Sequence, residues 1–447
     1  MSPTDPQDPG STTLEITVDA LANGGVAVGR TDGRVVFVRG AVPGERVRAR
    51  ITDDSHPSFW RAETVEILDA SPHRVPSVCA AAAAGAGCCD LAFIDPVHAR
   101  GLKRDVLVDV LRRVGHLPDT VVADTDLDSG VRALADDPTG WRIRTRLAVD
   151  DAGFAGQLGF RADEVITRVS CAQPDPRIPA GIDGGFTPHA ELVIVLDDAG
   201  RRHVTELAPV ATPRPGRSGR SRKQVQQRRH RLRAPRAERL LEGTDVAEHR
   251  VGARSWQIPV TGFWQAHRNA PETYANTIVE FARAHASTPP RVAWDLYGGA
   301  GVFAAALLDG DLGVSDLGVG DLGVGAVHVV DSDTRALAAA EKTFDGDDRV
   351  VIHAGEVAAQ IGSLPHPDLV VLDPPRTGAG ERVIGAIAAA EPDVVVHVGC
   401  DAARFARDLG LFAGHGYSVV GLRGFDAFVL THHVEAIACL VRNRSTA

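Results

Sequence analysis

The chain has 447 residues, of which 44% are hydrophobic and 24% charged, and its formal net charge is -10. One ordinary domain has about 100 to 200 residues, so this length predicts two or three folded units. The composition is typical of a globular protein, and no run of about 18 apolar residues predicts a membrane-spanning helix.

The N-terminal residues, MSPTDPQDPGSTT, lack the basic start and apolar stretch of a secretory signal. We therefore expect residues 1–12 to form a disordered tail and the protein to be cytoplasmic. Six cysteines, two of them adjacent, do not resemble the disulfide framework of a small secreted protein. They indicate metal binding or catalysis instead.

Short runs of alternating apolar and polar residues, separated by Gly, Pro and Asp, predict a small β-barrel near the N-terminus. The runs lie at 14–18, 35–38, 46–51 and 62–68. The stretch 24–51 resembles a TRAM domain, a small RNA-binding barrel related in shape to the OB-fold, and we place that domain at 13–72. The alternative is a barrel that only packs against its neighbour.

A central α+β domain is expected over residues 73–245. It begins with a cysteine-bearing segment and an Ala-rich loop (79–90), followed by an amphipathic helix. The apolar positions of that helix are Leu102, Val106, Val108, Val110 and Leu111. Short alternating strands between 141 and 204 predict a second β-rich unit, with Gly159, Phe160 and Arg161 at a turn.

Eleven Lys or Arg residues lie between Arg214 and Arg239. Such a block predicts a flexible basic arm that neutralises phosphates, so the negative net charge does not exclude a nucleic-acid partner. A solvated linker without a ligand is the alternative interpretation. The short repeat at 311–324 is interpreted as a loop insertion.

From about residue 290 the pattern changes to alternating strands and helices. Apolar strands are expected at 292–296, 327–330, 369–372 and 394–398, and helices at 334–343 and 402–411. This alternation predicts an α/β fold with a doubly wound, mostly parallel sheet.

A glycine-rich turn with Gly298, Gly299 and Gly301 follows the first of these strands, and Asp331 ends the next. Backbone without side chains at a helix N-terminus, together with a carboxylate for ribose hydroxyls, predicts a nucleoside-containing cofactor. The turn also satisfies the loose dinucleotide pattern. Asp373-Pro-Pro-Arg376 after the third strand favours a methyltransferase over a nicotinamide enzyme.

Taken together, the chain resembles the RNA uracil-5-methyltransferase family, whose members modify tRNA or ribosomal RNA. The matching motifs are Phe263-Trp-Gln265, Asp295-Leu-Tyr297-Gly, Asp331, Asp373-Pro-Pro-Arg376, Gly399-Cys400-Asp401 and Thr431-His-His-Val-Glu435. The resemblance implies a Rossmann-like methyltransferase domain at 246–447. It also implies that Gln265, Tyr297, Asp331 and Asp373 contact S-adenosylmethionine, although Gln265 and Tyr297 can alternatively be packing residues.

The same resemblance implies that Cys400 adds to C6 of uracil and that Glu435 removes the C5 proton. C5 is a poor nucleophile until a thiolate adds at C6, so this chemistry requires a reactive cysteine. Cys400 precedes the helix at 402–411, whose N-terminus is expected to favour the thiolate. His432 and His433 are alternative bases, but adjacent strand residues point to opposite faces, so we expect them to be structural. Cys439 is expected to be an inert buried residue.

Cys79, Cys88, Cys89 and Cys171 resemble the four ligands of a [4Fe-4S] cluster in part of this family. Here the second and third cysteines are adjacent rather than two residues apart, which is awkward for two corners of one cube, so a degenerate or absent cluster stays open. Ala402 and Val429 replace usual prolines of the family.

The sequence thus predicts a structured RNA, a tRNA or rRNA loop with the target uridine, as the partner; no membrane and no obligate protein partner are expected. Two alternatives stay open. One is a noncatalytic TRAM-type RNA-binding protein, and the other is a nicotinamide-dependent oxidoreductase.

Overall fold

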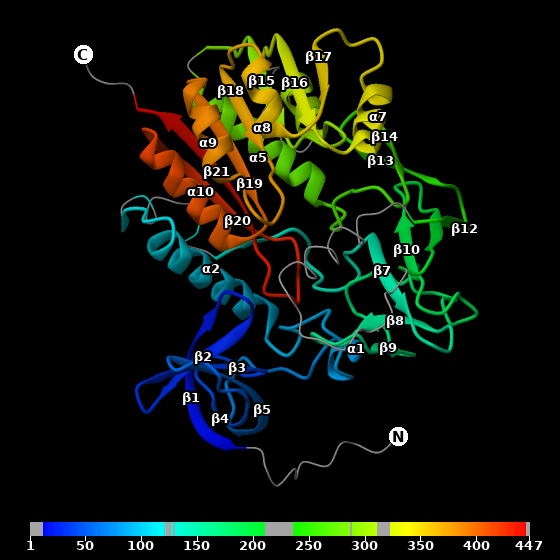
Figure 1. Cartoon of the computed structure of the whole chain (residues 1–447), viewed down its shortest axis with the longest axis vertical. Coiled ribbons are helices and arrows are strands. Elements are labelled where there is room, and N and C mark those ends of the chain that lie inside the picture. The colour runs from blue at the N-terminus through cyan, green and yellow to red at the C-terminus, as the bar shows by residue number, and fades with distance from the viewer. Residues whose placement is uncertain are drawn as a thin grey trace, which may run out of the picture. The chain divides into compact units, whose positions relative to one another are not determined.

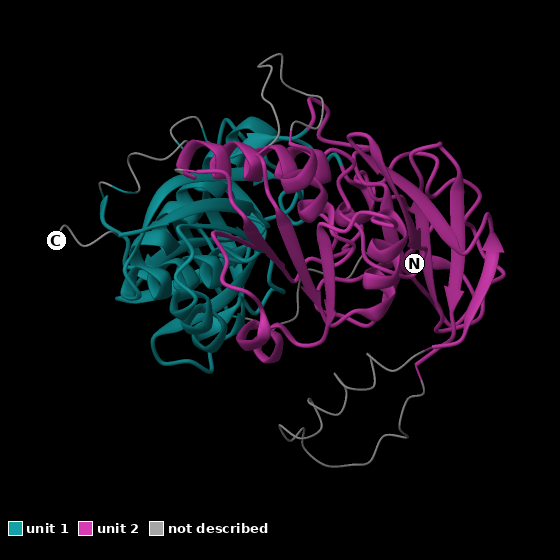
Figure 2. Ribbon diagram, turned by 90° about the horizontal axis from the view of Figure 1, so that it is seen from above, with its two compact units in different colours: residues 1–78, 90–134, 372–447 teal, residues 79–89, 135–371 magenta. Residues whose placement is uncertain are grey.

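The computed structural model describes residues 12–119, 121, 127, 130–210, 236–286, 288–310 and 322–443. The predicted tail, most of the basic block and most of the 311–324 repeat lie outside these residues. Figure 2 shows two compact units, each assembled from separate parts of the chain. The first unit contains 1–78, 90–134 and 372–447, and the second contains 79–89 and 135–371. These units cut across the predicted boundaries at 72 and 245, which stay predictions.

The first unit begins with a closed five-stranded barrel, drawn in blue in Figure 1. Its strands follow the order β1-β2-β3-β5-β4. Alternating residues such as Val36, Val38 and Val47 are fully buried inside it, as the period-two pattern predicts. The predicted barrel is confirmed. The strands are β1 (Thr13–Ala22), β2 (Val26–Thr31), β3 (Arg34–Arg39), β4 (Arg46–Asp53) and β5 (Phe59–Asp69).

The predicted amphipathic helix is also confirmed, as α2 (Pro96–Arg113) of the first unit. Asp95 caps its N-terminus by accepting a hydrogen bond from the backbone N–H of His98, and a proline occupies its first turn. Its buried face includes Lys103, whose Nζ lies 2.5 Å from Asp426 Oδ1 and also donates to the carbonyl of Phe428. The helix therefore holds the chain beyond residue 426 through a buried ion pair.

The remainder of the first unit is α/β. Its strands follow the order β19-β21-β20-β6, and β19, β21 and β20 pair antiparallel. The antiparallel hairpin formed by β20 and β21 departs from the parallel pairing expected for this domain as a whole. The elements are β6 (Arg132–Ala133), α9 (Gly380–Ala389), β19 (Val394–Gly399), α10 (Ala402–Gly414), β20 (Tyr417–Asp426) and β21 (Glu435–Arg442).

The second unit contains the predicted central β-rich region as a six-stranded sheet of order β12-β11-β10-β7-β8-β9. The Ala-rich stretch is not a loop, because Ala80–Ala83 form the short helix α1, whose first turn is capped by Cys79 Sγ. The strands are β7 (Arg144–Val149), β8 (Ala155–Leu158), β9 (Val165–Thr167), β10 (Glu191–Leu196), β11 (Arg202–Leu207) and β12 (Glu238–Glu242).

The second unit also contains the first half of the predicted doubly wound domain. A hairpin of β13 (Val246–Val251) and β14 (Arg254–Pro259) precedes α5 (Ala270–His285). The strands β15, β16 and β17 then pair parallel, and β18 lies beside β15. These elements are β15 (Val292–Leu296), α6 (Val302–Asp309), β16 (Ala326–Asp331), α7 (Thr334–Thr343), β17 (Val350–Ala354), α8 (Val357–Gln360) and β18 (Leu369–Leu372). The predicted strand and helix bounds of this region are confirmed within two residues.

No helix among the described residues has the length and apolarity needed to cross a bilayer.

Replacing Lys103 by alanine is expected to lower the free energy of unfolding by about 3–5 kcal/mol, because Asp426 then keeps a buried charge without its partner. Urea denaturation measures the loss. The matched control is Arg113→Ala, which removes a pair with Asp109 from a side chain that is 78% exposed. It is expected to cost less than about 0.5 kcal/mol. Equal effects of the two substitutions would contradict the structural role of Lys103.

Candidate active site

The glycine-rich turn of the second unit lies between β15 and α6. Gly299 and Gly301 both have positive φ angles, and Tyr297 adopts a φ of 61°, a rare conformation for a residue with a side chain. Gly298 is required by space, since a Cβ there would lie 2.7 Å from Asp295 Cγ. Asp295 Oδ2 accepts a hydrogen bond from the N–H of Ala304 in the first turn of α6. The sequence DLYGGAG therefore folds into a tight turn that exposes backbone near a helix start.

Asp331, at the end of β16, organises this turn. Its Oδ2 accepts a hydrogen bond from the N–H of Gly299 (2.9 Å), and its Oδ1 accepts one from the N–H of Asp333 (2.7 Å). Each carboxylate oxygen can accept more than one hydrogen bond, so the side chain can still receive two further hydroxyl donors. The structure thus places Asp331 beside the glycine-rich turn, as the sequence predicted.

Gln265 is positioned by its tryptophan neighbour in the same unit. Trp264 is buried and stacks on the ring of His249 at a centroid distance of 4.7 Å. It also contacts Trp256, whose Nε1 donates to the carbonyl of Ala300 in the glycine-rich turn (2.8 Å). The Phe-Trp-Gln segment is therefore anchored to the turn through two tryptophans, while Gln265 itself stays half-buried.

In the first unit, Cys400 and Glu435 lie at the same end of two paired strands. Gly399, the last residue of β19, pairs with Ala436 of β21, so Cys400 follows one member of this pair and Glu435, the first residue of β21, precedes the other. Glu435 is 4% exposed, and Cys400 is half-buried. The predicted nucleophile and the predicted base are thus brought together by antiparallel pairing.

The loop that carries Asp373 and Arg376 is tied to helix α10. Asp408 Oδ2 accepts a hydrogen bond from the N–H of Ala379 at 2.7 Å and contacts the buried ring of His397. Asp401 caps the N-terminus of α10 by accepting from the N–H of Arg404. The loop after β18 and the residue after β19 are consequently held by one helix.

Burial raises the pKa of the Cys400 thiol to about 12, with further contributions from the charges of Glu435 and Asp373. These effects favour the neutral thiol, whereas the Arg376 charge lowers the pKa of this thiol. The expectation that the helix N-terminus favours the thiolate stays a prediction.

Burial also raises the pKa of Glu435 well above its usual value, and the charge of Asp373 adds to this effect. The Arg376 guanidinium opposes the rise for both Glu435 and Cys400. The sequence motif includes Arg376, but the sequence alone predicts no role for it. Its place three residues after Asp373 is the one hint of this role in the sequence, because the charges that Arg376 faces depend on the fold.

The interpretation of His432 and His433 as strand residues on opposite faces is also wrong. Both lie between β20 and β21, and their ring centroids are 4.1 Å apart. Asp90 accepts hydrogen bonds from the backbone N–H and from the ring of His432. Burial lowers the pKa of His433 to about 3, with smaller contributions from His432 and Arg376, so this imidazole is a weak base. A structural role for both residues agrees with these contacts.

The four cysteines predicted as metal ligands come together in the second unit, where their sulfur atoms all lie within 4.8 Å of one another. Cys79 Sγ lies 3.7 Å from Cys88 Sγ, and Cys89 Sγ lies 3.6 Å from Cys171 Sγ. Adjacency of Cys88 and Cys89 therefore does not prevent convergence. Among the described residues, this is the one group of three or more side chains that could hold a metal ion.

Comparison with known proteins agrees with this architecture. Residues 11–65 match the family model of the TRAM domain, as the sequence predicted. The chain is 39% identical over 441 residues to an uncharacterized RNA methyltransferase of Corynebacterium glutamicum, covering 96% of this chain and 97% of that protein. An uncharacterized RNA methyltransferase of Streptomyces avermitilis is 33% identical over 446 residues, covering 95% and 97%.

Among solved structures, the chain is similar to a tRNA (uracil-54, C5)-methyltransferase of Pyrococcus abyssi in complex with S-adenosyl-L-homocysteine. The TM-score is 0.64 with 18% identity, covering 95% of this chain and 99% of that one. At this identity the likeness shows the fold, which confirms an α/β Rossmann-like domain combined with an N-terminal barrel.

The pKa of Cys400 is expected to rise further in the variant Arg376→Gln, because the cation that opposes the two carboxylates is removed. The rate of alkylation of Cys400 by iodoacetamide, followed by mass spectrometry of its peptide between pH 7 and 10, reports the thiolate fraction. The wild type should react about tenfold faster per pH unit in this range. The variant should react more slowly at each pH. Arg404→Gln, on the exposed side of α10, is the control, and identical rates for all three proteins would contradict this role of Arg376.

Proposed function

The chain belongs to the RNA methyltransferases, and from this premise we propose that it methylates C5 of a uracil in tRNA or rRNA, with S-adenosylmethionine as the methyl donor. The observation that carries the proposal is the convergence of Cys400, Glu435 and Asp373, with Arg376 as counter-charge, at one end of β19 and β21. A thiol beside a buried carboxylate is the pair that addition to C6 and removal of the C5 proton require.

S-adenosylmethionine supplies an electrophilic methyl group when it is bound. For this donor we propose Gln265, Tyr297 and Asp331 as binding residues, since the turn of Gly299 and Gly301 exposes backbone beside the Asp331 carboxylate. Asp373 is proposed to contact the donor as well. Its charge also acts on Cys400 and Glu435.

The proposed reaction begins when the Cys400 thiolate bonds to C6 of the uracil and the ring becomes nucleophilic at C5. After C5 has gained the methyl group, Glu435 accepts the C5 proton, and the bond between Cys400 and C6 breaks to restore the thiolate. Glu435 accepts a proton readily because its pKa is raised by burial. Arg376 favours the ionised forms of both groups, which the reaction needs at the same time.

The two alternatives differ from this proposal in what they require of the site. A nicotinamide-dependent oxidoreductase has no use for the convergence of Cys400 and Glu435, and the family assignment speaks against it. A noncatalytic RNA-binding protein would keep the barrel and the RNA but would form no bond to the base. Structured RNA is the proposed partner both for the methyltransferase and for the noncatalytic RNA-binding protein.

A stable covalent complex is expected between the protein and RNA that contains 5-fluorouridine, because fluorine cannot be removed as the C5 proton is. The complex should require both S-adenosylmethionine and Cys400, and denaturing gel electrophoresis detects it. Cys400→Ala should form no complex and lose at least about 10⁴-fold in methylation rate. Sequencing the attached nucleotide names the target uridine.

In the variant Glu435→Gln, the bond to C6 should still form on ordinary uridine, but the adduct should accumulate because no base removes the C5 proton. Cys439→Ala is the matched cysteine control and should methylate normally, since Cys439 is a fully buried residue of β21. A wild-type protein that binds the RNA but forms no adduct would support the noncatalytic alternative.

We also propose that Cys79, Cys88, Cys89 and Cys171 hold a metal group, with the [4Fe-4S] cluster as the one that the family resemblance implies. Their chemistry fits, since four thiolates suffice for such a cluster and no other residue is needed. The separations of 3.6 and 3.7 Å also lie close to the edge of about 3.8 Å expected for four thiolates around one tetrahedral ion. In either case the group would stabilise the fold of this segment, because methyl transfer needs no electron.

Elemental analysis of protein purified without oxygen should find four iron and four sulfide per chain, and the variant Cys171→Ser should lose them together with several degrees of melting temperature. One zinc per chain without sulfide would identify the single-ion site instead. Metal-free protein with four titratable thiols in this segment would contradict the metal proposal altogether. Cys439→Ser, which lies outside the cluster, is the control for the loss of metal.

A further inference from the structure

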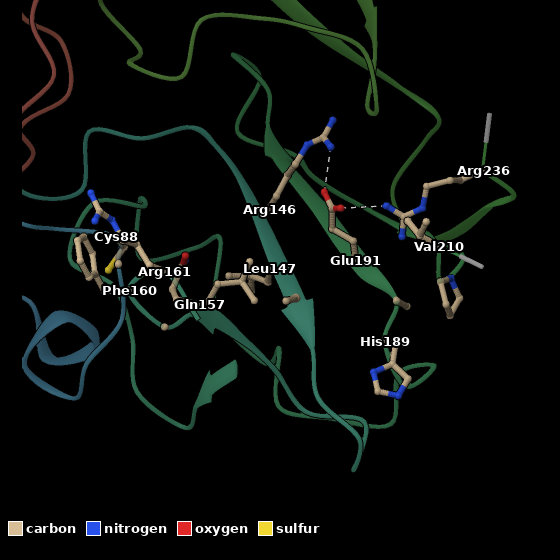
Figure 3. A pocket seen from close by; sticks show the side chains of 16 residues that line it. Cys88, Arg146, Leu147, Gln157, Phe160, Arg161, His189, Glu191, Val210 and Arg236 are labelled. Carbon is tan, nitrogen blue, oxygen red and sulfur yellow. Dashed lines mark hydrogen bonds and ion pairs between the residues drawn. The ribbon is translucent and has the colours of Figure 1, made fainter. Parts of the chain in front are cut away.

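The sheet of the second unit carries a pocket of about 820 Å³ that the proposed reaction does not use. Figure 3 shows that its wall runs from Cys88, Phe160 and Arg161 past Leu147 to Arg146, Glu191 and Arg236. These side chains come from the cysteine-bearing segment, β7, β10, the turn after β8 and the chain just before β12. A concave site of this size, with few charged groups and an apolar floor, is the usual form of a ligand site.

Positively charged side chains outnumber negatively charged ones in the lining of the pocket. Arg146 and Arg236 share one carboxylate, since each donates to a different oxygen of Glu191 at 2.9 Å. Arg161 makes no ion pair within the described part of the chain. Three guanidinium groups and one carboxylate thus line the pocket, and the surplus positive charge suits an anionic ligand.

One end of the pocket offers an aromatic surface beside this charge. The Arg161 guanidinium lies over the Phe160 ring, 5.1 Å from its centroid, and Leu158 is 50% exposed nearby. Stacking on an aromatic ring next to an arginine is how proteins hold unpaired bases without reading their sequence. This end thus fits a nucleobase, and the arginines fit its phosphates.

The aromatic end is held by the cysteine-bearing segment. The N–H of Phe160 donates to the carbonyl of Gly85, and the N–H of Gly87 donates to the carbonyl of Leu158. The carbonyl of Glu164 closes the turn by accepting from the N–H of Gly159 at 2.8 Å. The four-cysteine cluster therefore supports the turn that presents Phe160 and Arg161.

Val210 and Arg236, which flank residues 211–235 in the sequence, both line the pocket. Those 25 residues include nine Lys or Arg. Positive charge joined covalently to two residues of the pocket favours a polyanionic chain over a small anion.

We propose that this pocket is a second RNA-binding site, in which Arg146 and Arg161 bind phosphates of an unpaired strand of the substrate and Phe160 stacks on one of its bases. The proposal rests on the function proposed above and extends it, because it assigns part of RNA recognition to the central β-rich region. The site is distinct from the residues that react with the target uracil.

Binding of fluorescein-labelled oligouridine of about 16 nucleotides, measured by fluorescence anisotropy with the metal-loaded full-length protein, tests the site. Arg161→Glu should weaken binding at least tenfold and lower the slope of log affinity against log salt concentration by about 0.7 or more. Phe160→Ala should weaken binding at least fivefold without changing the salt slope. Thermal melting checks that both variants fold.

Arg250→Glu is the matched control, because Arg250 lies on β13 outside the pocket and its side chain is 70% exposed. It should bind within twofold of the wild type. If Arg161→Glu and Phe160→Ala also bind within twofold, the proposal is overturned. It is overturned equally if a duplex RNA of the same length binds as tightly as the oligouridine and is as sensitive to Phe160→Ala, since paired bases cannot stack on that ring.

The readout separates this proposal from the uracil chemistry. Cys400→Ala should bind oligouridine like the wild type, because the pocket does not include the nucleophile. Absence of a covalent adduct with 5-fluorouridine RNA would contradict uracil methylation but leave the binding result intact. Normal adduct formation together with unimpaired oligouridine binding by both pocket variants would contradict the second RNA-binding site but leave uracil methylation intact.

Discussion

The burial of a thiol and two carboxylates beside a single arginine is the constraint on which the proposed active site depends. Desolvation favours the neutral forms of Cys400 and Glu435, and Asp373 reinforces this effect. A thiolate and a carboxylate must nevertheless exist side by side during the reaction. Arg376 is the cation of this unit that opposes their neutralisation, and a positively charged methyl donor would act in the same direction.

Such a site needs firm support, and the first unit supplies it around Glu435. The segment between β20 and β21 is held at three points, by Lys103 on Asp426 and Phe428, by the backbone of Leu91 on Leu430, and by Asp90 on His432. All three contacts come from the region around α2. The position of the proposed base thus depends on residues more than 300 positions away in the sequence.

The second unit combines three features that the sequence presents separately. The backbone of the cysteine-bearing segment 79–89 is hydrogen-bonded to the turn of Phe160 and Arg161, the same turn lines the basic pocket, and so do Val210 and Arg236, which flank residues 211–235. If the pocket holds RNA as proposed, a metal group on the four cysteines would stabilise a binding surface without a redox role.

The sequence by itself determined the elements and the motifs, because they depend on local pattern. Period-two alternation located the barrel strands, and the motifs identified the glycine-rich turn and Asp331, which the structure joins by a hydrogen bond. It could also place Cys400 after a strand, but it could not give the burial and the charges that raise the pKa of this thiol.

Only the tertiary structure decided the environment of each group, since charges and burial come from residues distant in the chain. The pKa of Cys400 depends on Glu435 and Asp373, the conformation of His432 depends on Asp90, and the meeting of Cys88 and Cys89 with Cys171 depends on a turn 82 residues away. The local sequence pattern determines on which face of its helix or strand a residue lies. Long-range packing determines which charges and which apolar groups surround that face, and the chemistry of the residue depends on these surroundings.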